Sequence, residues 1–291
     1  MVGVTTIANL NAPAGKQISL YYNLKNQNLG LQQRNESTSQ DPPTDVYVSS
    51  ITAQVGWIEN PSQVASANLT GLPLVFGFTE KKADPAVPKQ LNHDVSILSP
   101  VYNPVGQTLK DNKTIAAVSD GVSASVFFLT GGSGNAYKIE EAVVGQIQPD
   151  DWSGTAVIIQ DSSLAAYYSE PGVRRIIYQA ADNSEIHDYR PKRGYVNIGN
   201  TNAKDASPLA VVTAGSKAYL YYVNTHDQVK RIVKSDLSNP DSWGQEQDVN
   251  APKKVSKESQ ITVISAGGKN HLFYVAQGAS DTTFEHIVDS Q

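Results

Sequence analysis

One predicted hairpin carries an arginine and an aspartate that folding would bring together. The stretch RRIIYQAADNSEIHDYR, residues 174–190, has two β-branched and aromatic runs separated by a polar turn, which is typical of a β-hairpin. Arg175 lies near the start of the first run and Asp188 near the end of the second. If such a pair recurs in every repeat, the chain is a multivalent sugar binder. If it occurs once, it can be a plain cross-strand ion pair worth about 0.2–1 kcal/mol.

The sequence lacks the residues that most other kinds of functional site need. The chain has no cysteine, which excludes disulfides, thiolate metal sites and a cysteine nucleophile, and its five scattered histidines have no metal-binding spacing. The glycine-rich stretch TGGSGNAYK, residues 130–138, lacks the following helix of a phosphate loop, so we predict a hairpin turn there. No Ser-His-Asp motif stands out. We therefore expect neither a metal nor an organic cofactor.

Charge and hydropathy narrow the range of partners. The 23 basic and 28 acidic residues give a net charge of -5 without a basic cluster, so we expect no nucleic-acid partner. No apolar run approaches the roughly 20 residues of a membrane span, and we expect no membrane association. The first ten residues, MVGVTTIANL, do not resemble a signal peptide. Localisation stays open between a cytoplasmic protein and a secreted one whose leader was removed, and three sequons at Asn35, Asn68 and Asn112 carry little weight.

A repeated hairpin organises the whole chain. Each copy has a short β-branched strand, a polar turn, and a second strand that ends in two bulky residues. Five copies occupy residues 5–23, 113–129, 163–179, 207–223 and 259–275. Their second bulky residues are Tyr22, Phe128, Tyr178, Tyr222 and Tyr274, spaced by 106, 50, 44 and 52 residues. The first gap holds two units, and residues 51–78 supply the missing copy, with a longer excursion predicted between its strands.

Six units in 291 residues average about 49 residues each, the size of a propeller blade. We predict an all-β fold: one six-bladed β-propeller domain over residues 1–291, with four-stranded antiparallel blades and the two termini combining to close the ring. The turns PDDW (149–152) and PDSW (240–243) are predicted to lead into outer strands. The aromatic pairs are predicted to pack between blades.

The quoted hairpin resembles a blade of the fungal fucose-specific lectins, which are six-bladed propellers. The matching residues are Arg175, Tyr178, Gln179 and the run Ile186-His187-Asp188. In that family an arginine and a glutamate hold the sugar hydroxyls, and aromatic residues of an adjacent blade stack on its apolar side. This chain has Asp188 where the family has glutamate, which shortens the reach of the carboxylate.

The resemblance in strand pattern extends over nearly the whole chain. The sugar-binding pair, in contrast, is not repeated in the other blades. At the positions of Arg175 and Asp188, four other blades are predicted to carry different pairs. These are Ser19 with Gln33, Ser125 with Glu141, Tyr219 with Arg231, and His271 with His286. A single site would lack the avidity of repeated sites. The pattern favours one asymmetric small-molecule pocket.

Two functions follow from these residues. The first is a cofactor-independent cycloaddition catalyst of the hetero-Diels-Alderase kind in fungal natural-product biosynthesis, acting on apolar or aromatic reactants by orienting them and hydrogen-bonding a carbonyl. The predicted catalytic residues are Arg175, Tyr219, His271 and His286. The predicted substrate-binding residues are Asp188, Tyr178, Gln179, Tyr222 and Glu141. The alternative is a fucose-type lectin without catalysis, and a third option is a structural or interaction propeller with no small ligand. A homodimer is an open possibility in each case.

Overall fold

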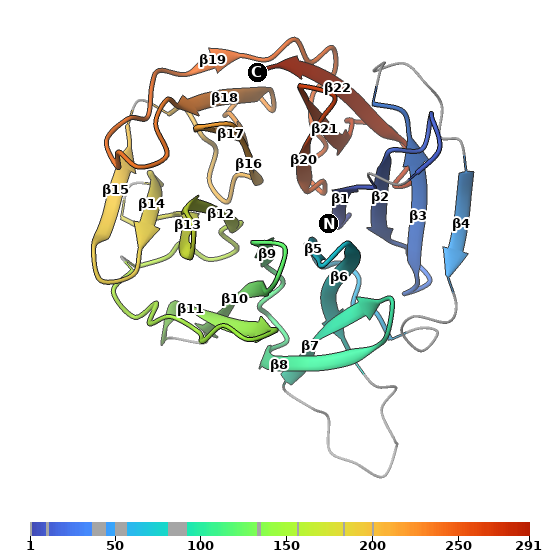
Figure 1. The fold of residues 1–291 in the computed structure, drawn as a ribbon, viewed down its shortest axis with the longest axis horizontal. Coiled ribbons are helices and arrows are strands. Elements are labelled where there is room, and N and C mark those ends of the chain that lie inside the picture. Colours follow the sequence, from blue (N-terminus) through green and yellow to red (C-terminus); the bar gives the residue numbers. More distant parts are fainter. Residues whose placement is uncertain are drawn as a thin grey trace.

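Six antiparallel sheets surround a central axis in a computed structural model of the chain (Figure 1). The structure describes residues 2–9, 12–36, 45–49, 57–80, 92–132, 135–155, 157–182, 184–199 and 201–291. The described elements are all strands, in agreement with the predicted all-β six-bladed propeller. No helix in these ranges is long and apolar enough to cross a membrane.

Each blade is built from consecutive strands, and the first strand of each blade lies nearest the axis (Figure 1). Blade 1 contains β1 (Val4–Ala8), β2 (Ile18–Asn23), β3 (Leu29–Arg34) and β4 (Asp45–Ser49); blade 2 contains β5 (Val64–Leu69), β6 (Leu72–Thr79), β7 (Asn92–Ser99) and β8 (Asn103–Leu109). Blade 3 contains β9 (Ile115–Ser119), β10 (Ala124–Gly132) and β11 (Asn135–Val144); blade 4 contains β12 (Ala165–Glu170), β13 (Val173–Gln179), β14 (Ile186–Arg190) and β15 (Gly194–Ile198). Blade 5 contains β16 (Leu209–Ala214), β17 (Lys217–Val223), β18 (Val229–Lys234) and β19 (Gln247–Asp248); blade 6 contains β20 (Ile261–Ala266), β21 (Lys269–Val275) and β22 (Phe284–Ser290). Within the described residues, blades 3 and 6 therefore have three strands and the others four.

The repeated aromatic residues lie on the second strand of their blades and pack between neighbouring blades. They are all at most 1% exposed: Tyr22, Phe128, Tyr178, Tyr222 and Tyr274. Tyr222 shares a hydrophobic cluster with residues of blade 4, and Tyr274 shares one with residues of blade 5. Fully burying such a side chain contributes about 1.5–3 kcal/mol. The spacing of these aromatic residues in the sequence thus reports the period of the ring.

Blade 2 departs from its predicted layout. Its first hairpin joins β5 and β6 through a tight turn at Thr70 and Gly71, both of which have positive φ. The longer excursion that we predicted between the two strands is therefore absent. The sequence NLTGLP already contains the glycine that such a turn favours. Residues 51–56, which are predicted to begin this copy, lie outside the described residues.

The ring closes where blade 6 packs against blade 1. The ring of Tyr22 lies 5.1 Å from that of Phe284, and the hydroxyls of Thr6 and Thr262 are 3.0 Å apart. A single parallel bridge joins Val2 to Ser259. The first and last blades thus close the ring through packing and one bridge, and they share no sheet within the described residues. The two termini do not combine in one blade as predicted: the N-terminal end lies near the axis and the C-terminal end at the outer rim (Figure 1).

A buried serine fixes the start of three inner strands. The Oγ atoms of Ser162, Ser207 and Ser259 accept hydrogen bonds of 2.8–2.9 Å from backbone N–H groups at the end of the second strand of the same blade. These serines are at most 1% exposed. Each hydroxyl thus satisfies a donor that would otherwise be buried without a partner.

We expect Ser207→Ala to lower the free energy of unfolding by about 1–3 kcal/mol, because it leaves the Val223 N–H buried and unpaired. Urea denaturation measures this, with Ser238→Ala on the exposed loop of blade 5 as the matched control. Equal midpoints for the two variants would contradict the role of the buried hydroxyl.

Candidate functional site

Arg175 and Asp188 are in contact, as the sequence predicts, and both are buried. Arg175 Nε donates to Asp188 Oδ1 at 2.8 Å. The residue opposite Asp188 in the β13–β14 register is Ile177, so the pair is a diagonal cross-strand contact. Arg175 is 3% exposed and Asp188 is 0% exposed. A ligand in solution therefore cannot reach either side chain in the folded protein.

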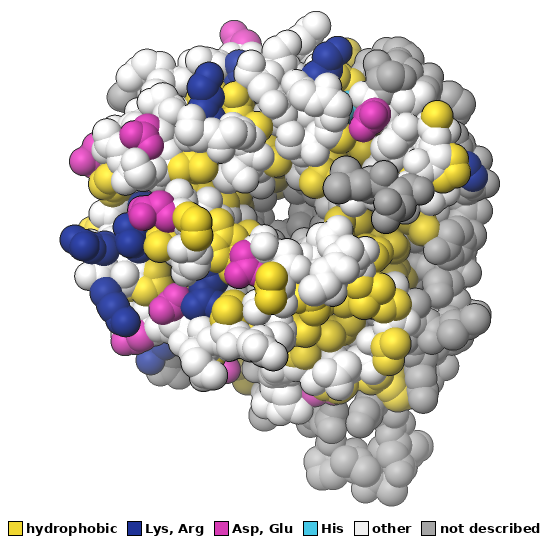
Figure 2. Space-filling model, in the orientation of Figure 1, with side chains coloured by type: hydrophobic (Ala, Val, Ile, Leu, Met, Phe, Trp, Pro, Cys, Tyr) yellow, Lys and Arg dark blue, Asp and Glu magenta, His cyan; other side chains and the backbone are white. Residues whose placement is uncertain are grey.

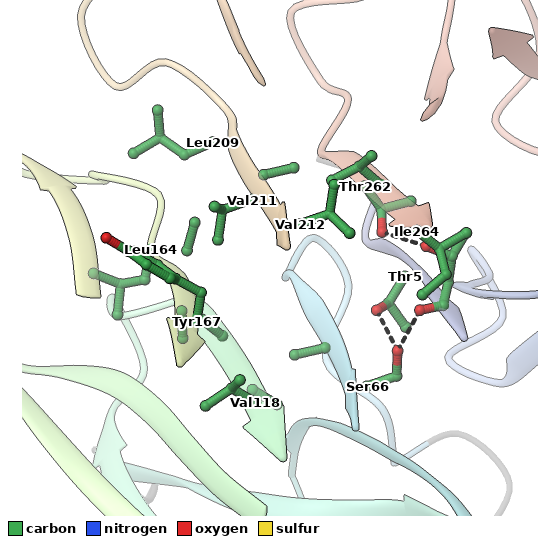
Figure 3. Close-up of a pocket in the computed structure, with 18 of the residues that line it drawn as sticks. Thr5, Ser66, Val118, Leu164, Tyr167, Leu209, Val211, Val212, Thr262 and Ile264 are labelled. Atoms are coloured by element: carbon green, nitrogen blue, oxygen red, sulfur yellow. Dashed lines mark hydrogen bonds between the residues drawn. The ribbon is translucent and has the colours of Figure 1, made fainter. Parts of the chain in front are cut away.

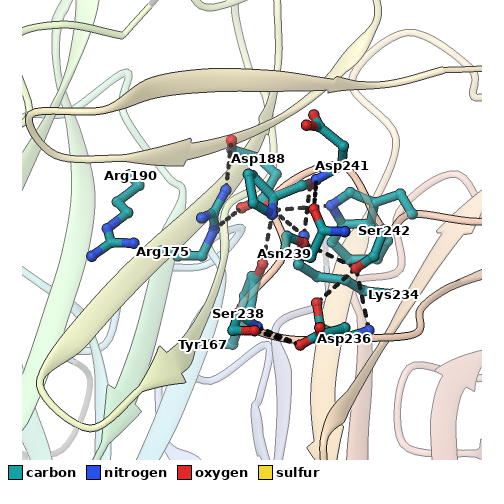
Figure 4. Close-up of polar contacts among 12 residues, drawn as sticks. Tyr167, Arg175, Asp188, Arg190, Lys234, Asp236, Ser238, Asn239, Asp241 and Ser242 are labelled. Carbon is teal, nitrogen blue, oxygen red and sulfur yellow. Dashed lines mark hydrogen bonds and ion pairs between the residues drawn. The ribbon is translucent and has the colours of Figure 1, made fainter.

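The next blade covers this pair with further polar groups (Figure 4). Asp188 Oδ2 accepts hydrogen bonds from the Tyr167 hydroxyl at 2.8 Å and from the Trp243 indole at 2.9 Å. Lys234 Nζ lies 3.7 Å from the same oxygen and donates to the Pro240 carbonyl at 2.8 Å. The cluster therefore joins β12, β13 and β14 of blade 4 to β18 and the following loop of blade 5.

The protonation of the cluster follows from burial and from the central carboxylate. Burial alone would lower the pKa of Arg175, but the adjacent Asp188 raises it above its ordinary value. Burial lowers the pKa of Lys234 to about 8, against the attraction of Asp188. Both oxygens of Asp188 are occupied by protein groups. The arrangement fits the ion-pair interpretation of the hairpin and leaves no free acceptor for a sugar.

The other predicted catalytic residues lie on two further blades. Tyr219 is buried in blade 5, with the guanidinium of Arg231 6.0 Å from the centre of its ring. His271 and His286 meet in blade 6, where Nδ1 of the first is 2.9 Å from Nε2 of the second. The structure brings the two histidines together and Arg175 to Asp188. It does not place all four predicted donors around one cavity.

The remaining predicted binding residues have partners within the protein. Gln179 accepts from the Ser207 N–H at 2.7 Å and donates to the Lys204 carbonyl at 3.0 Å. The Tyr222 hydroxyl donates to Glu246, and Tyr178 is fully buried in the blade interface.

Glu141 belongs to a second buried cluster. Its carboxylate lies 2.8 Å from the guanidinium of Arg174 and accepts from the Trp152 indole at 2.9 Å. The PDDW turn, predicted to lead into an outer strand, is followed by no fourth strand of blade 3 in the described residues, and its Trp152 is buried against this carboxylate. The PDSW turn does precede an outer strand, β19 of blade 5. Glu141 thus contacts an indole and a cation at the boundary of blades 3 and 4, as Asp188 does at the boundary of blades 4 and 5.

Strand register tests the predicted equivalence of positions between blades. Counted from the aromatic residue of each second strand, the equivalents of Asp188 are Glu141, Arg231 and His286, as predicted. In blade 1 the equivalent is Leu31, because Gln33 lies two residues too far along β3. The predicted pairing of Ser19 with Gln33 is a direct cross-strand pair in another register.

Two positions on the third strands, those of Asp188 and Lys234, form charged contacts across two successive blade boundaries. Asp188 of blade 4 faces Lys234 of blade 5, and Arg231 of blade 5 faces Asp289 of blade 6 with its guanidinium at 2.6 Å. Lys234 and Asp289 occupy equivalent positions on the third strands of their blades. At the second boundary the signs are reversed: the cation Arg231 occupies the position of Asp188, and the carboxylate of Asp289 occupies the position of Lys234. These positions therefore connect blades, a role that a comparison of third-strand positions in the sequence could have indicated.

A hollow on the ring axis offers a separate site. It has a volume of about 280 Å³ and is lined by the innermost strands of all six blades. Figure 2 shows the centre of the ring hollowed on the face drawn, and Figure 3 shows the lining side chains. None of the side chains around it carries a charge at neutral pH, and none of the predicted site residues contributes to it. We call it the axial pocket.

Gln260 lines both the axial pocket and a second hollow. Its side-chain oxygen accepts from the N–H groups of Val4 at 3.0 Å and Val64 at 3.2 Å, and its amide nitrogen donates to the Val64 carbonyl at 3.0 Å. Gln260 thus joins blade 6 to blades 1 and 2. The second hollow, of about 300 Å³, has charged residues of both signs around it, including Asp161 and Lys257.

Comparisons with known proteins support the fold. No family model matches the chain. Two curated fungal proteins, both described as wall-associated proteinases, align over the whole chain and 96% of their own length: one from Coccidioides immitis at 27% identity and one from Coccidioides posadasii at 28%.

Solved structures, among them that of a fungal fucose-specific lectin, have the same fold. A lectin of Aleuria aurantia, described as a six-bladed β-propeller with a novel fucose recognition mode, aligns with a TM-score of 0.66 at 16% identity, covering 99% of this chain and 95% of its own. AofleA from Arthrobotrys oligospora aligns with a TM-score of 0.61 at 12% identity, covering 100% and 87%. At these identities the similarity shows the six-bladed β-propeller fold alone.

Proposed function

We propose that this protein is a lectin-type propeller that binds one small neutral molecule in the axial pocket. The observation that supports this is the uncharged lining of a cavity of about 280 Å³, just below the roughly 300–1,000 Å³ of ligand pockets. The blade boundaries are less suitable for a ligand, because the carboxylates of Asp188 and Glu141 there already bind cations and indoles of the protein. One axial site per chain replaces a ring of repeated sites.

Fucose-type sugars are the first ligands to test. A structure of the Aleuria aurantia lectin is described in complex with α-methyl-L-fucoside. A fucoside is neutral, which suits a lining without charge. Because a single site gains no avidity from neighbouring sites, we expect weak binding to free sugar.

Catalysis of a cycloaddition stays a prediction from the sequence. Arg175, Tyr219 and the histidine pair are buried in three different blades, and none of them lines the axial pocket. Proteolysis is not proposed either: within the described ranges, no histidine contacts a serine hydroxyl. Binding is the function for which the pocket supplies a physical basis.

Ligand-observed NMR with α-methyl-L-fucoside and a library of small neutral compounds tests the proposal. We expect at least one ligand whose signal is lost in Val212→Trp, because the larger side chain fills the pocket (Figure 3). Thr225→Val, at an exposed turn of blade 5, is the control that should bind normally. Binding that survives Val212→Trp but disappears in Arg175→Lys would place the site at the blade boundary instead.

A further inference from the structure

The axial pocket has two chemically different sides (Figure 3). Strand register places Thr5 and Thr6 of blade 1, Ser66 of blade 2 and Thr262 of blade 6 at two neighbouring levels of the inner strands. At the same two levels blades 3, 4 and 5 have only alanine and valine: Ala116, Ala117, Ala165, Ala166, Ala210 and Val211. A group of hydroxyls thus faces an apolar wall across the pocket.

The hydrogen bonds among these hydroxyls fix the direction of one of them. Ser66 Oγ donates its single hydrogen to the Thr6 carbonyl at 2.9 Å. Ser66 and Thr5 hydroxyls are 2.8 Å apart, so Thr5 must be the donor in that contact. The hydrogen of Thr5 is therefore committed. Its oxygen can only accept a hydrogen bond from a ligand.

The second pair of hydroxyls adds one free donor. Thr6 Oγ1 and Thr262 Oγ1 are 3.0 Å apart, and one hydrogen suffices for that contact. The other hydroxyl keeps a hydrogen that it can donate. The polar side of the pocket consequently offers more acceptor positions than donor positions. A ligand group that both donates and accepts, such as an alcohol, matches it better than a carbonyl, which only accepts.

We infer that the axial pocket selects neutral alcohols with an apolar face over carbonyl compounds of the same shape. This rests on the proposed function and names its ligand class. The hydroxyl side, with Thr5 as an obligate acceptor, binds the alcohol O–H, and the alanine and valine wall covers the apolar face. A ketone in the same position would set its oxygen against the Thr5 oxygen. That contact has no hydrogen to share.

Paired probes of equal shape test the inference. We would titrate cyclohexanol and cyclohexanone into the protein and follow both by ligand-observed NMR, with Val212→Trp reporting binding in the pocket. The alcohol should bind about fivefold tighter or more than the ketone, as expected for one additional hydrogen bond. Thr5→Val, which keeps the shape and removes the acceptor, should abolish this preference while ketone binding is unchanged.

The outcomes distinguish failure of the alcohol preference from failure of the proposed binding function. Thr225→Val should keep the preference, and a normal melting temperature of Thr5→Val shows that the fold is intact. Equal binding of both probes in the parent protein, sensitive to Val212→Trp, would overturn the alcohol preference and leave the pocket as a binding site. No Val212→Trp-sensitive signal from either probe would overturn the proposed function, and the preference with it.

Discussion

Asp188→Asn is expected to lower the free energy of unfolding by about 3–5 kcal/mol, the usual effect of removing one partner of a buried ion pair. The substitution keeps the size of the side chain but removes the charge that holds Arg175 at 2.8 Å and Lys234 at 3.7 Å. Both cations are almost fully buried and have no other carboxylate within ion-pair distance in the described residues. Chemical denaturation at pH 7 measures the loss.

The matched control for this variant is Asp248→Asn. Asp248 also pairs with a lysine, Lys230, but its side chain is 88% exposed, and such surface pairs contribute about 0–1 kcal/mol. We expect a shift in the midpoint for Asp188→Asn that is several times larger. If the two variants unfold at the same denaturant concentration, the cluster at the boundary of blades 4 and 5 is not a stabilising contact.

The second large effect is a loss of stability in acid caused by the histidine pair of blade 6. Burial lowers the pKa of His271 and of His286, and His271 and Arg34 lower the pKa of His286 further, to about 3. Both histidines are therefore neutral in the fold, whereas the unfolded chain takes up protons below about pH 6.5. The stability is fully present above pH 6.5 and falls as the pH drops from 6.5 toward 3. For His286 the slope is about 1.4 kcal/mol per pH unit.

His286→Gln removes this titration and keeps a group that can hydrogen-bond His271. The free energy of unfolding of the variant should therefore depend less steeply on pH between 6.5 and 4 than that of the parent chain. His226→Gln, at an exposed turn, is the control for the loss of a histidine at another position. Parallel curves for His286→Gln and the parent would show that His286 binds protons equally well in the folded and unfolded chain.

The fold could be predicted because a propeller repeats its packing. Five of the six blades bury an aromatic residue at the same place on the second strand, so Tyr178, Tyr222 and Tyr274 recur at nearly regular spacing and reveal the ring. Blade 2 was harder to place. At the equivalent position its register has Gly77, whose missing side chain makes room for Leu98, and the aromatic signal is lost.

The site was less predictable because it depends on contacts between blades. The hairpin alone indicates that Arg175 meets Asp188, yet the groups that cover them, Lys234 and Trp243, follow Asp188 by 46 and 55 residues. Nothing within the hairpin reveals that its carboxylate is fully occupied. The axial pocket is hidden for a related reason: its threonines, alanines and valines are the ordinary composition of inner strands, and only the ring places Thr262 beside Thr6.

The stoichiometry of ligand binding tests the central proposal most directly. Native mass spectrometry or calorimetry with the best small neutral ligand should give one molecule per chain, and Val212→Trp should abolish it. Several equivalent molecules per chain, retained in Val212→Trp and lost when Arg175 is replaced by lysine, would instead place recognition at the blade boundaries and contradict an axial site.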